Sequence, residues 1–232
     1  MTKDDYAALP GVKRARVIGG QVLLQGDCLD VMLVLERPDA MLVDPPYGIG
    51  EIMFGSGHFG GLCKRMGGED GWDKSPPPAW VFENDYPTIA WGGNYLGLKP
   101  SRGWLCWVKN NATTTFSSVE LAWSNMDFNA KHFISAAGCP KSEKAGHPTQ
   151  KPVALMEWCL GFLSNAKTIL DPFMGSGTTL VACQKLGRSG IGIELDPDYF
   201  DIACKRVEEA TRQPDLFVQP KAEEPHQEGF DL

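Results

Sequence analysis

The hydrophobic and polar positions in the last third of the chain follow two alternating periods. Residues 168–170 and 189–194 form short apolar runs that are typical of buried strands, and residues 178–187 and 197–212 have the apolar spacing of helices. The order strand, helix, strand, helix is typical of parallel strands joined by helices that cover the sheet. The pattern therefore predicts an α/β fold.

The first two thirds of the chain contain further apolar runs that are bounded by turn residues. Helical spacing occurs at residues 28–36 and again at residues 153–164, where a proline stands at the favoured start of the helix. The predicted strands are residues 22–25, 40–43, 88–91, 103–109 and, from a weaker pattern, 120–123. These elements extend the α/β pattern toward the start of the chain.

Glycine, proline and charge divide the chain into a folded part and a tail. Its 232 residues and 25.4 kDa correspond most simply to one domain. Residues 51–78 are rich in glycine and proline and predict a long loop. Residues 213–232 are polar, acidic and proline-bearing, so they predict a flexible tail. We therefore expect a single domain over residues 1–212.

The composition is that of an ordinary globular protein, with 43% hydrophobic and 22% charged residues. No stretch reaches the roughly 18 apolar residues that a membrane span needs, and the first residues contain no apolar signal segment. The seven cysteines show no C-x-x-C spacing and the four histidines are scattered, so we expect neither a metal site nor a disulfide framework. These features predict a cytoplasmic protein with no membrane partner.

The net charge of −7 argues by itself against a nucleic-acid partner, but the charge is unevenly distributed. Residues 99–151 contain seven basic and three acidic residues, which gives a local charge of +4. Contact with phosphates requires such local basicity, although a solvated surface explains any single lysine equally well. The candidates for nucleic-acid contact are Lys109, Lys131, Lys141 and Lys144.

A glycine-bearing loop follows the predicted strand at residues 168–170, in the sequence TILDPFMGSGTTL. Gly175 and Gly177 would let the backbone approach a ligand closely, and the free N–H groups at the following helix start would attract a negative group. Glu194, at the end of the next strand, is placed to accept hydrogen bonds from ribose hydroxyls. The sequence therefore predicts a nucleoside site.

The ligand of this site is expected to carry a positive group. The loop lacks the full G-x-G-x-x-G pattern, which makes a pyrophosphate a poor candidate, and Asp171 would repel a phosphate but suit an ammonium group. S-adenosylmethionine has that ammonium group, a carboxylate for the helix start, ribose hydroxyls for Glu194 and a sulfonium methyl group to donate.

A second unusual stretch, MLVDPPYGIG, ends the predicted strand at residues 40–43. Asp44 and Pro45 each precede a proline, so both are excluded from the helical region, and neither Pro45 nor Pro46 has an N–H group. The result is a stiff, extended elbow that presents a carboxylate and bare carbonyl groups. Taken alone, two prolines after a strand are equally compatible with an ordinary turn.

Read together, D-P-P-Y and D-P-F-x-G-S-G-T-T resemble the motifs of DNA methyltransferases that methylate exocyclic amines with S-adenosylmethionine. The elbow precedes the cofactor loop, which resembles the circularly permuted beta class of that family. The blocks AWGGNYL, WLCWVKN, SSVELAW and HPTQKPVALMEWCL are also similar, so the resemblance covers roughly residues 22–209. It implies a Rossmann-like fold with a mixed, mostly parallel sheet, helices on both faces, and double-stranded DNA as substrate.

The resemblance also implies a set of cofactor contacts. Glu194 would bind the ribose, and Asp27 would contact the adenine amine of the cofactor. The residues that would close over the methionine moiety are Thr149, Gln150 and Lys151. The residues that would line its methionine end are Asp171, Phe173, Gly175, Ser176, Gly177 and Thr178.

In this interpretation the elbow holds the amine that is methylated. An exocyclic amine is a poor nucleophile because its lone pair is delocalised into the ring. Asp44 and the carbonyl of Pro45 would accept its two hydrogens, and the rigidity of Pro45 and Pro46 would fix these acceptors. Tyr47 would stack on a base that has left the duplex.

Several alternatives remain open. Methylation at a ring carbon of cytosine would need a cysteine nucleophile, and the dipeptide Cys139-Pro140 has the reverse of the usual order. We expect adenine N6 as the target, because an elbow that begins with Asp resembles mostly adenine-specific members, and N4 of cytosine is the alternative. RNA or protein glutamine as the substrate, and an inactive module that only binds the cofactor and nucleic acid, are further alternatives.

We expect the protein to recognise a short or relaxed target site. Only residues 126–146 are free for a recognition insertion, so base contacts are expected from this stretch and from residues 51–78. Specific protein–DNA interfaces usually bury about 1,000 Å² or more of protein surface. A small monomer covers little duplex, and we therefore expect a homodimer.

Overall fold

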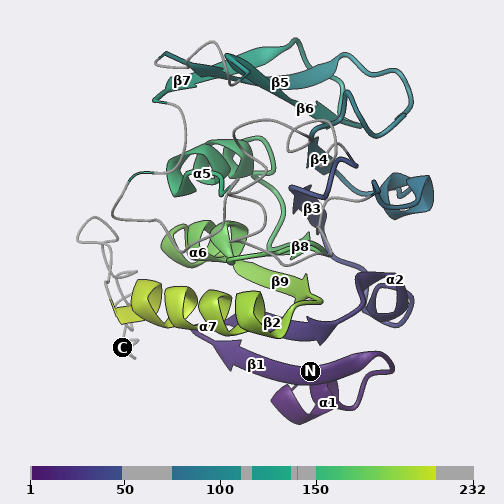
Figure 1. Cartoon of the computed structure of the whole chain (residues 1–232), viewed down its shortest axis with the longest axis vertical. Helices are drawn as coiled ribbons and strands as arrows, with labels where there is room; N and C mark the ends of the chain where they lie inside the picture. The colour runs from purple at the N-terminus through teal and green to yellow at the C-terminus, as the bar shows by residue number, and fades with distance from the viewer. Residues whose placement is uncertain (1, 49–74, 111–116, 137–139, 141–149, 213–232) are drawn as a thin grey trace, which may run out of the picture.

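A nine-stranded mixed sheet runs through the centre of the molecule (Figure 1). The computed structural model describes residues 2–48, 75–110, 117–136, 140 and 150–212. The strands follow the order β1-β2-β9-β8-β3-β4-β6-β5-β7 across the sheet. Their bounds are β1 Val12–Ile18, β2 Gln21–Gly26, β3 Ala40–Val43, β4 Thr88–Trp91, β5 Gly103–Lys109, β6 Val119–Ser124, β7 Lys131–Ser135, β8 Thr168–Asp171 and β9 Ser189–Glu194.

Five adjacent strands in the middle of the sheet are parallel. β2 pairs with β9, β9 with β8, β8 with β3, and β3 with β4, all in the same direction. β6 runs against β4 and β5, and β1 runs against β2. The carboxyl ends of the five central strands therefore lie at one edge of the sheet, where ligands usually bind in open α/β sheets.

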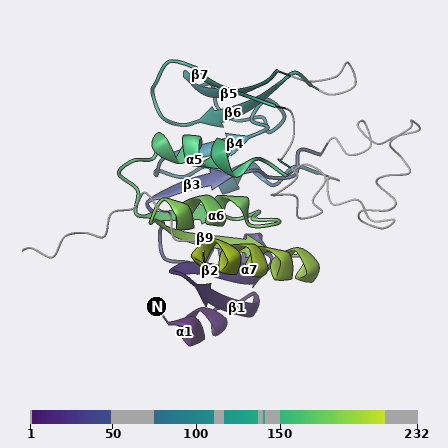
Figure 2. The ribbon, with the colours of Figure 1, turned by 90° about the vertical axis from the view of Figure 1, so that its left-hand side faces the viewer.

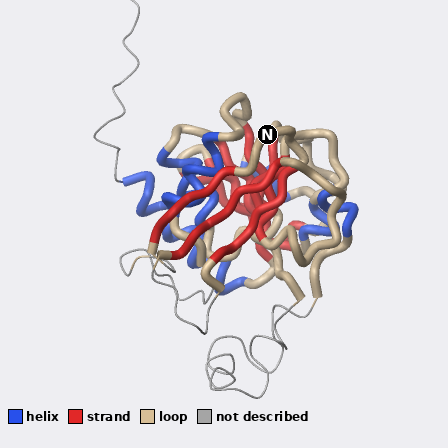
Figure 3. Tube along the Cα trace, turned by 90° about the horizontal axis from the view of Figure 1, so that it is seen from above, coloured by secondary structure: helices blue, strands red, loops and turns tan. Residues whose placement is uncertain are grey.

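Helices cover both faces of the sheet, as Figures 2 and 3 show. Helices α5, α6 and α7 lie on one face, and the short α2 and the 3₁₀ helix η1 lie on the other. The helices are α1 Lys3–Ala7, α2 Cys28–Val31, η1 Ala79–Phe82, α5 Val153–Gly161, α6 Thr178–Lys185 and α7 Pro197–Arg212. The expected α/β sheet with helices on both faces is thus confirmed.

The alternation of side chains along β3 shows why the central strands are apolar throughout. Leu42 packs into the cluster beneath α5 and α6, whereas Met41 and Val43 point to the opposite face and pack against η1. Successive side chains of a strand point to opposite faces, and here both faces are covered. All four residues of β3 are therefore buried.

The strands expected from the sequence are present, and the helix expected at residues 197–212 is present over its full length as α7. Three other helices are shorter than their periodic patterns. The pattern at residues 28–36 gives only α2, and those at 153–164 and 178–187 end at Gly161 and Lys185. Elements that the sequence analysis did not identify are α1, β1, η1 and β7. β1 and β7 are edge strands in which exposed residues predominate, with one buried residue in β1 and only partly buried ones in β7.

Of three stretches expected at the periphery, two are described in part and the tail is not described. Of the stretch 126–146, residues 131–135 form β7, which pairs in parallel with β5 and so belongs to the sheet itself. Most of the glycine-rich loop and the whole of the acidic tail, residues 213–232, lie outside the described residues. In the part of the chain that the structure covers, no helix has the length and apolar character needed to cross a bilayer.

Truncation of Leu42 tests whether β3 anchors the sheet. Leu42→Ala should lower the free energy of unfolding by about 2–5 kcal/mol, because it leaves a cavity in a fully buried strand. Leu33→Ala is the matched control, since Leu33 is 72% exposed and its loss should change stability by no more than about 0.5 kcal/mol. Urea unfolding followed by circular dichroism measures both, and equal midpoints would contradict the assignment.

Candidate active site

Four acidic residues meet at the carboxyl edge of the parallel strands. Asp27 follows β2, Asp44 follows β3, Asp171 ends β8 and Glu194 ends β9. The register aligns these ends, because Gln25 lies opposite Glu194 and β3 lies beside β8. Burial is the largest cause that raises the pKa of the Asp171 carboxyl, and the charges of Asp44 and Glu194 raise it further, so these three groups are electrostatically coupled.

The elbow after β3 is held by contacts of the Tyr47 side chain. The Tyr47 hydroxyl donates a hydrogen bond of 2.6 Å to Oδ1 of Asp44. A Cβ atom at Gly92, which has φ +69°, would overlap the Tyr47 ring, so the ring packs directly on the backbone after β4. The ring also stacks on that of Tyr95, with centroids 5.5 Å apart. The Tyr47 ring, which was expected to stack on a base, thus stacks on Tyr95 in this structure.

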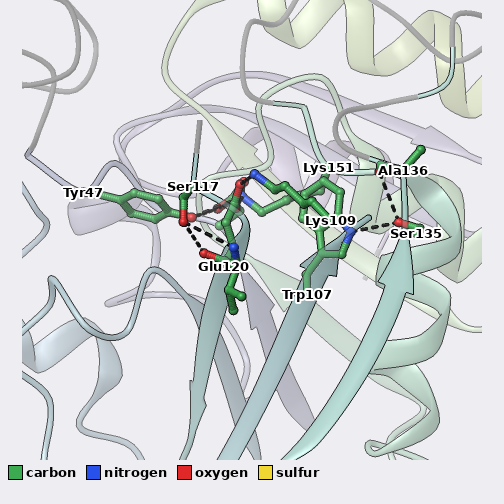
Figure 4. Close-up of polar contacts among 10 residues, drawn as sticks. Tyr47, Trp107, Lys109, Ser117, Glu120, Ser135, Ala136 and Lys151 are labelled. Atoms are coloured by element: carbon green, nitrogen blue, oxygen red, sulfur yellow. Dashed lines mark hydrogen bonds and ion pairs between the residues drawn. The ribbon is translucent and has the colours of Figure 1, made fainter. Parts of the chain in front are cut away.

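A buried lysine, Lys151, contacts the elbow, and Figure 4 shows its side chain beside Tyr47 and Glu120. Lys151 is 4% exposed, and its Nζ donates to Oδ1 and Oδ2 of Asp44, both at 2.8 Å. The same atom is 3.1 Å from the Tyr47 hydroxyl and 3.1 Å from Oε2 of Glu120. The resemblance to methyltransferases had implied that Lys151 contacts the cofactor, whereas here its ammonium group contacts the elbow.

The charges of this cluster compensate one another. Burial alone would lower the pKa of Lys151, but Asp44 and Glu120 outweigh it and raise that pKa well above its usual value. Burial alone would raise the pKa of Glu120, but the ammonium groups of Lys151 and Lys109 outweigh it and lower that pKa. Burial, followed by the charge of Asp44, raises the pKa of Tyr47. At neutral pH Lys151 and Glu120 are therefore both charged.

The lysines expected to contact nucleic acid differ in their surroundings. Lys109 forms an ion pair with Glu120, its side chain is 10% exposed, and its Nζ lies 4.7 Å from the centre of the Trp107 ring. It is therefore engaged inside the protein and does not present its charge to a phosphate. Lys131 is exposed on β7, and Lys141 and Lys144 lie outside the described residues.

The glycine loop between β8 and α6 is fixed by Glu194 and by Arg206 of α7. The N–H of Gly175 donates to Oε2 of Glu194 at 2.8 Å, and the guanidinium of Arg206 donates to the carbonyl of Ser176 at 2.6 Å and to the Thr178 hydroxyl at 3.1 Å. Gly177 has φ +79° and precedes the first residue of α6, where a side chain would also crowd α7. The loop thus leaves the start of α6 facing the acidic edge.

Two carboxyl groups at this edge have perturbed pKa values. Asp171 is 3% exposed, and burial raises its pKa from the ordinary 3.8 to about 7, although the N–H of Phe173 donates to it. Burial also raises the pKa of Glu194. Buried carboxyl groups with raised pKa values are typical of functional sites, because a cationic ligand would compensate them.

The remaining residues expected at the cofactor are partly placed. Asp27 is the N-cap of α2 and accepts the N–H of Leu29 at 2.9 Å, and Gln150 is buried beside Lys151. Thr149 lies outside the described residues. Three residues of the site were not predicted from the sequence: Glu120, Tyr95 and Arg206. The only signal for Glu120 was a carboxylate within an apolar strand pattern.

Comparison with known families identifies the chain. The family described as DNA methylase, whose name refers to N6 and N4 methyltransferases, matches residues 73–205, which is more than half of the chain. The chain belongs to this DNA methylase family. The elbow at Asp44 precedes the matched residues, so the family assignment rests on β4 to α7.

Relatives of the DNA methylase chain include several Type II methyltransferases. M.HinfI of Haemophilus influenzae is 26% identical over 83% of this chain and 69% of its own length, and M2.MboI of Moraxella bovis is 25% identical over 82% and 88%. M.HpaI of Haemophilus parainfluenzae is 43% identical over 34% of this chain. The matches to M.HpaI and to M.ScaI of Streptomyces caespitosus span only 26% and 22% of those relatives.

Two solved structures share the fold of this chain. The M1.HpyAVI–SAM complex has a TM-score of 0.51, with 24% identity, over 80% of this chain and 98% of the other. The cytosine-N4-specific PvuII DNA methyltransferase also has a TM-score of 0.51, with 14% identity, over 84% and 92%. The methylase thus has the Rossmann-like methyltransferase fold that the resemblance implied, and in its chain β3 with the elbow precedes β8 with the glycine loop.

The raised pKa of Asp171 predicts how the stability of the methylase depends on pH. Between pH 3.8 and about 7 the folded state keeps a proton that the unfolded state has lost, so the free energy of unfolding should fall as pH rises through this range. Asp171→Asn should remove this component and make the protein more stable than the wild type at pH 8.

Urea unfolding of both proteins at pH 5 and pH 8 measures the effect. Asp85→Asn is the control, because the Asp85 side chain is 82% exposed and its loss should leave the pH dependence unchanged. A wild-type protein and an Asp171→Asn variant with the same change between the two pH values would contradict the assignment.

Proposed function

We propose that the protein transfers the methyl group of S-adenosylmethionine to the exocyclic amine of a base in DNA, most simply N6 of adenine. The observation that carries the proposal is the position of Asp44 beside Asp171 at one edge of the sheet. An elbow that suits an amine thereby lies next to a loop that suits a nucleoside. Membership of the DNA methylase family and the Type II names of the relatives support a site-specific DNA methyltransferase.

The residues at the edge fit the chemical groups of S-adenosylmethionine. The buried carboxyl of Asp171 suits an ammonium group, and the start of α6 suits a carboxylate. Glu194 accepts one N–H at each oxygen, from Gly175 and Asp196, and each oxygen keeps a second lone pair for a ribose hydroxyl. When bound, the cofactor would supply a methyl group on a positively charged sulfur.

The elbow would prepare the amine for this methyl group. Asp44 and the carbonyl of Pro45 would accept its two hydrogens, which turns the nitrogen lone pair out of the plane of the base. The nitrogen would then gain the methyl group as the carbon–sulfur bond of the cofactor breaks and its sulfur becomes neutral, and it would give up one of its two protons, for which Asp44 is a nearby acceptor. The elbow has fixed geometry because Tyr47 and Lys151 hold Asp44, so little reorganisation is needed.

The choice of adenine rests on the first residue of the elbow. Asp at this position is more typical of adenine-specific members, whereas both adenine and cytosine present an exocyclic amine that the same acceptors could hold. We also propose the permuted beta class, because the elbow precedes the glycine loop in the chain. Since DNA is the proposed substrate and the relatives come from bacteria, we propose that the protein acts in the cytoplasm.

Transfer of a labelled methyl group tests the activity. Purified protein with methyl-labelled S-adenosylmethionine should label duplex DNA in preference to RNA or protein, and long-read sequencing should place the mark on adenine. Asp44→Ala should lower kcat by about 10²-fold or more, because it removes a preorganised hydrogen-bond partner. Cofactor binding without labelling of any substrate would instead support an inactive binding module, and a mark on cytosine would overturn the choice of base.

We propose a homodimer, because a chain of this size covers little duplex DNA. Light scattering of the protein with and without duplex DNA should give a mass near twice 25.4 kDa in at least one condition. A mass of one chain in both conditions would rule the homodimer out.

A further inference from the structure

Four charged side chains of alternating sign form a continuous chain that ends at the elbow. Asp44 bonds to Lys151, Lys151 to Glu120, and Glu120 to Lys109. We propose that Lys151 and Glu120 are positioning residues, which aim the carboxylate of Asp44 so that Oδ2 receives the target amine. This inference rests on the proposed methylation of an amine.

The charged side chains of this series come from different strands and meet at the carboxyl edge of the sheet. Asp44 follows β3, Glu120 is on β6 and Lys109 ends β5, while β4 lies between β3 and β6. The ammonium of Lys151 lies over this interval, with its Nζ 5.6 Å from the centre of the Trp91 ring on β4. The view in Figure 4 shows Lys109, Lys151 and Glu120 converging from different elements. Contacts between separate elements fix each member of the chain.

The ammonium of Lys151 needs both carboxylates to remain in place. A buried charge is costly unless it is paired and hydrogen-bonded, and Lys151 is 4% exposed. Asp44 and Glu120 together give one negative charge more than Lys151 can balance, and Lys109 supplies the second positive charge. The four groups are therefore neutral as a set, and removing one of them disturbs the position of the others.

The contacts of Asp44 distinguish its two oxygens. Oδ1 accepts from the Tyr47 hydroxyl at 2.6 Å and from Lys151 at 2.8 Å, which uses both of its lone pairs. Among contacts with described residues, Oδ2 accepts only from Lys151, at 2.8 Å. The Asp44 side chain is 22% exposed while Lys151 is buried beneath it, so the ammonium leaves the outer side of the carboxylate open. Oδ2 thus keeps a lone pair for an incoming N–H group.

The same contacts argue against direct binding of the cofactor by Lys151. An ammonium group has three N–H donors. Asp44, Tyr47 and Glu120 lie within 3.1 Å of Nζ and can take all three. A carboxylate of the cofactor would have to displace one of these partners. Lys151 acts on the reaction through Asp44, and its loss should affect turnover and not cofactor affinity.

Steady-state kinetics of full-length variants on duplex DNA test the inference. Glu120→Gln keeps the shape of the side chain and removes its charge, and it should lower kcat by about 10-fold, while Lys151→Met should lower kcat by about 10²-fold through misplacement of Asp44. The dissociation constant of S-adenosylmethionine, measured by calorimetry without DNA, should stay within about 3-fold of the wild type for both variants. The double variant Glu120→Gln/Lys151→Met should be no slower than Lys151→Met, because both residues act on Asp44 through the same series of ion pairs.

Glu157→Gln is the matched control. Glu157 forms an ion pair of 3.1 Å with Lys185 at the surface, so its loss removes an equal charge and should leave kcat unchanged. Urea unfolding of each variant distinguishes a loss of folding from a misplaced Asp44 carboxylate. If Lys151→Met fails to fold, the result for Glu120→Gln decides the test. A wild-type kcat for Glu120→Gln, or cofactor affinity weakened more than 10-fold in Lys151→Met, would overturn the inference. Methyl transfer by the wild type in that experiment would leave the proposed function standing.

Discussion

The parallel pairing of β3 with β8 is the constraint on which the site depends. The two strands are separated by more than half of the sequence, and their pairing through Ala40 with Ile169 and Met41 with Leu170 brings their ends to one edge of the sheet. Asp44 and Asp171 leave the sheet beside each other only because both strands run in the same direction. An antiparallel pairing would place the elbow and the glycine loop at opposite ends of the molecule.

The acidic residues at this edge differ in how their charges are compensated. Asp44 has its own cation, because Lys151 contacts both of its oxygens from the interior. Asp171 is buried without such a partner, and its pKa is raised to about 7. A positive group of a ligand would therefore bind favourably beside the Asp171 carboxylate. Asp44, whose charge is already balanced, can accept a hydrogen bond from a neutral amine without attracting a second cation. The part of the site around Asp171 therefore suits a cationic ligand, and the part around Asp44 suits a neutral amine.

The sequence predicts the parts of the site that depend on local geometry. Two prolines after a strand fix the elbow at Asp44, and glycines with positive φ fix the loop at Gly177, so both can be recognised in a short stretch of chain. The pairing of Glu120 with Lys151 is not local, because it depends on β6 lying two strands from β3. The edge strands β1 and β7 were missed for a related reason, since strands covered on one side at most lack a continuous apolar run.

The net charge of a stretch of sequence does not show which of its basic residues can contact DNA. Of the seven basic residues between positions 99 and 151, Lys109 and Lys151 balance carboxylates inside the protein, and Arg102 forms an ion pair with Asp127. Among the described residues of that stretch, Lys99 and Lys131 are exposed and belong to none of these pairs. The local charge of +4 therefore includes lysines that serve the elbow. In the described part of this stretch, fewer basic residues can attract a phosphate than the net charge suggests. A phosphate responds to charge at the surface and not to the sum along the sequence.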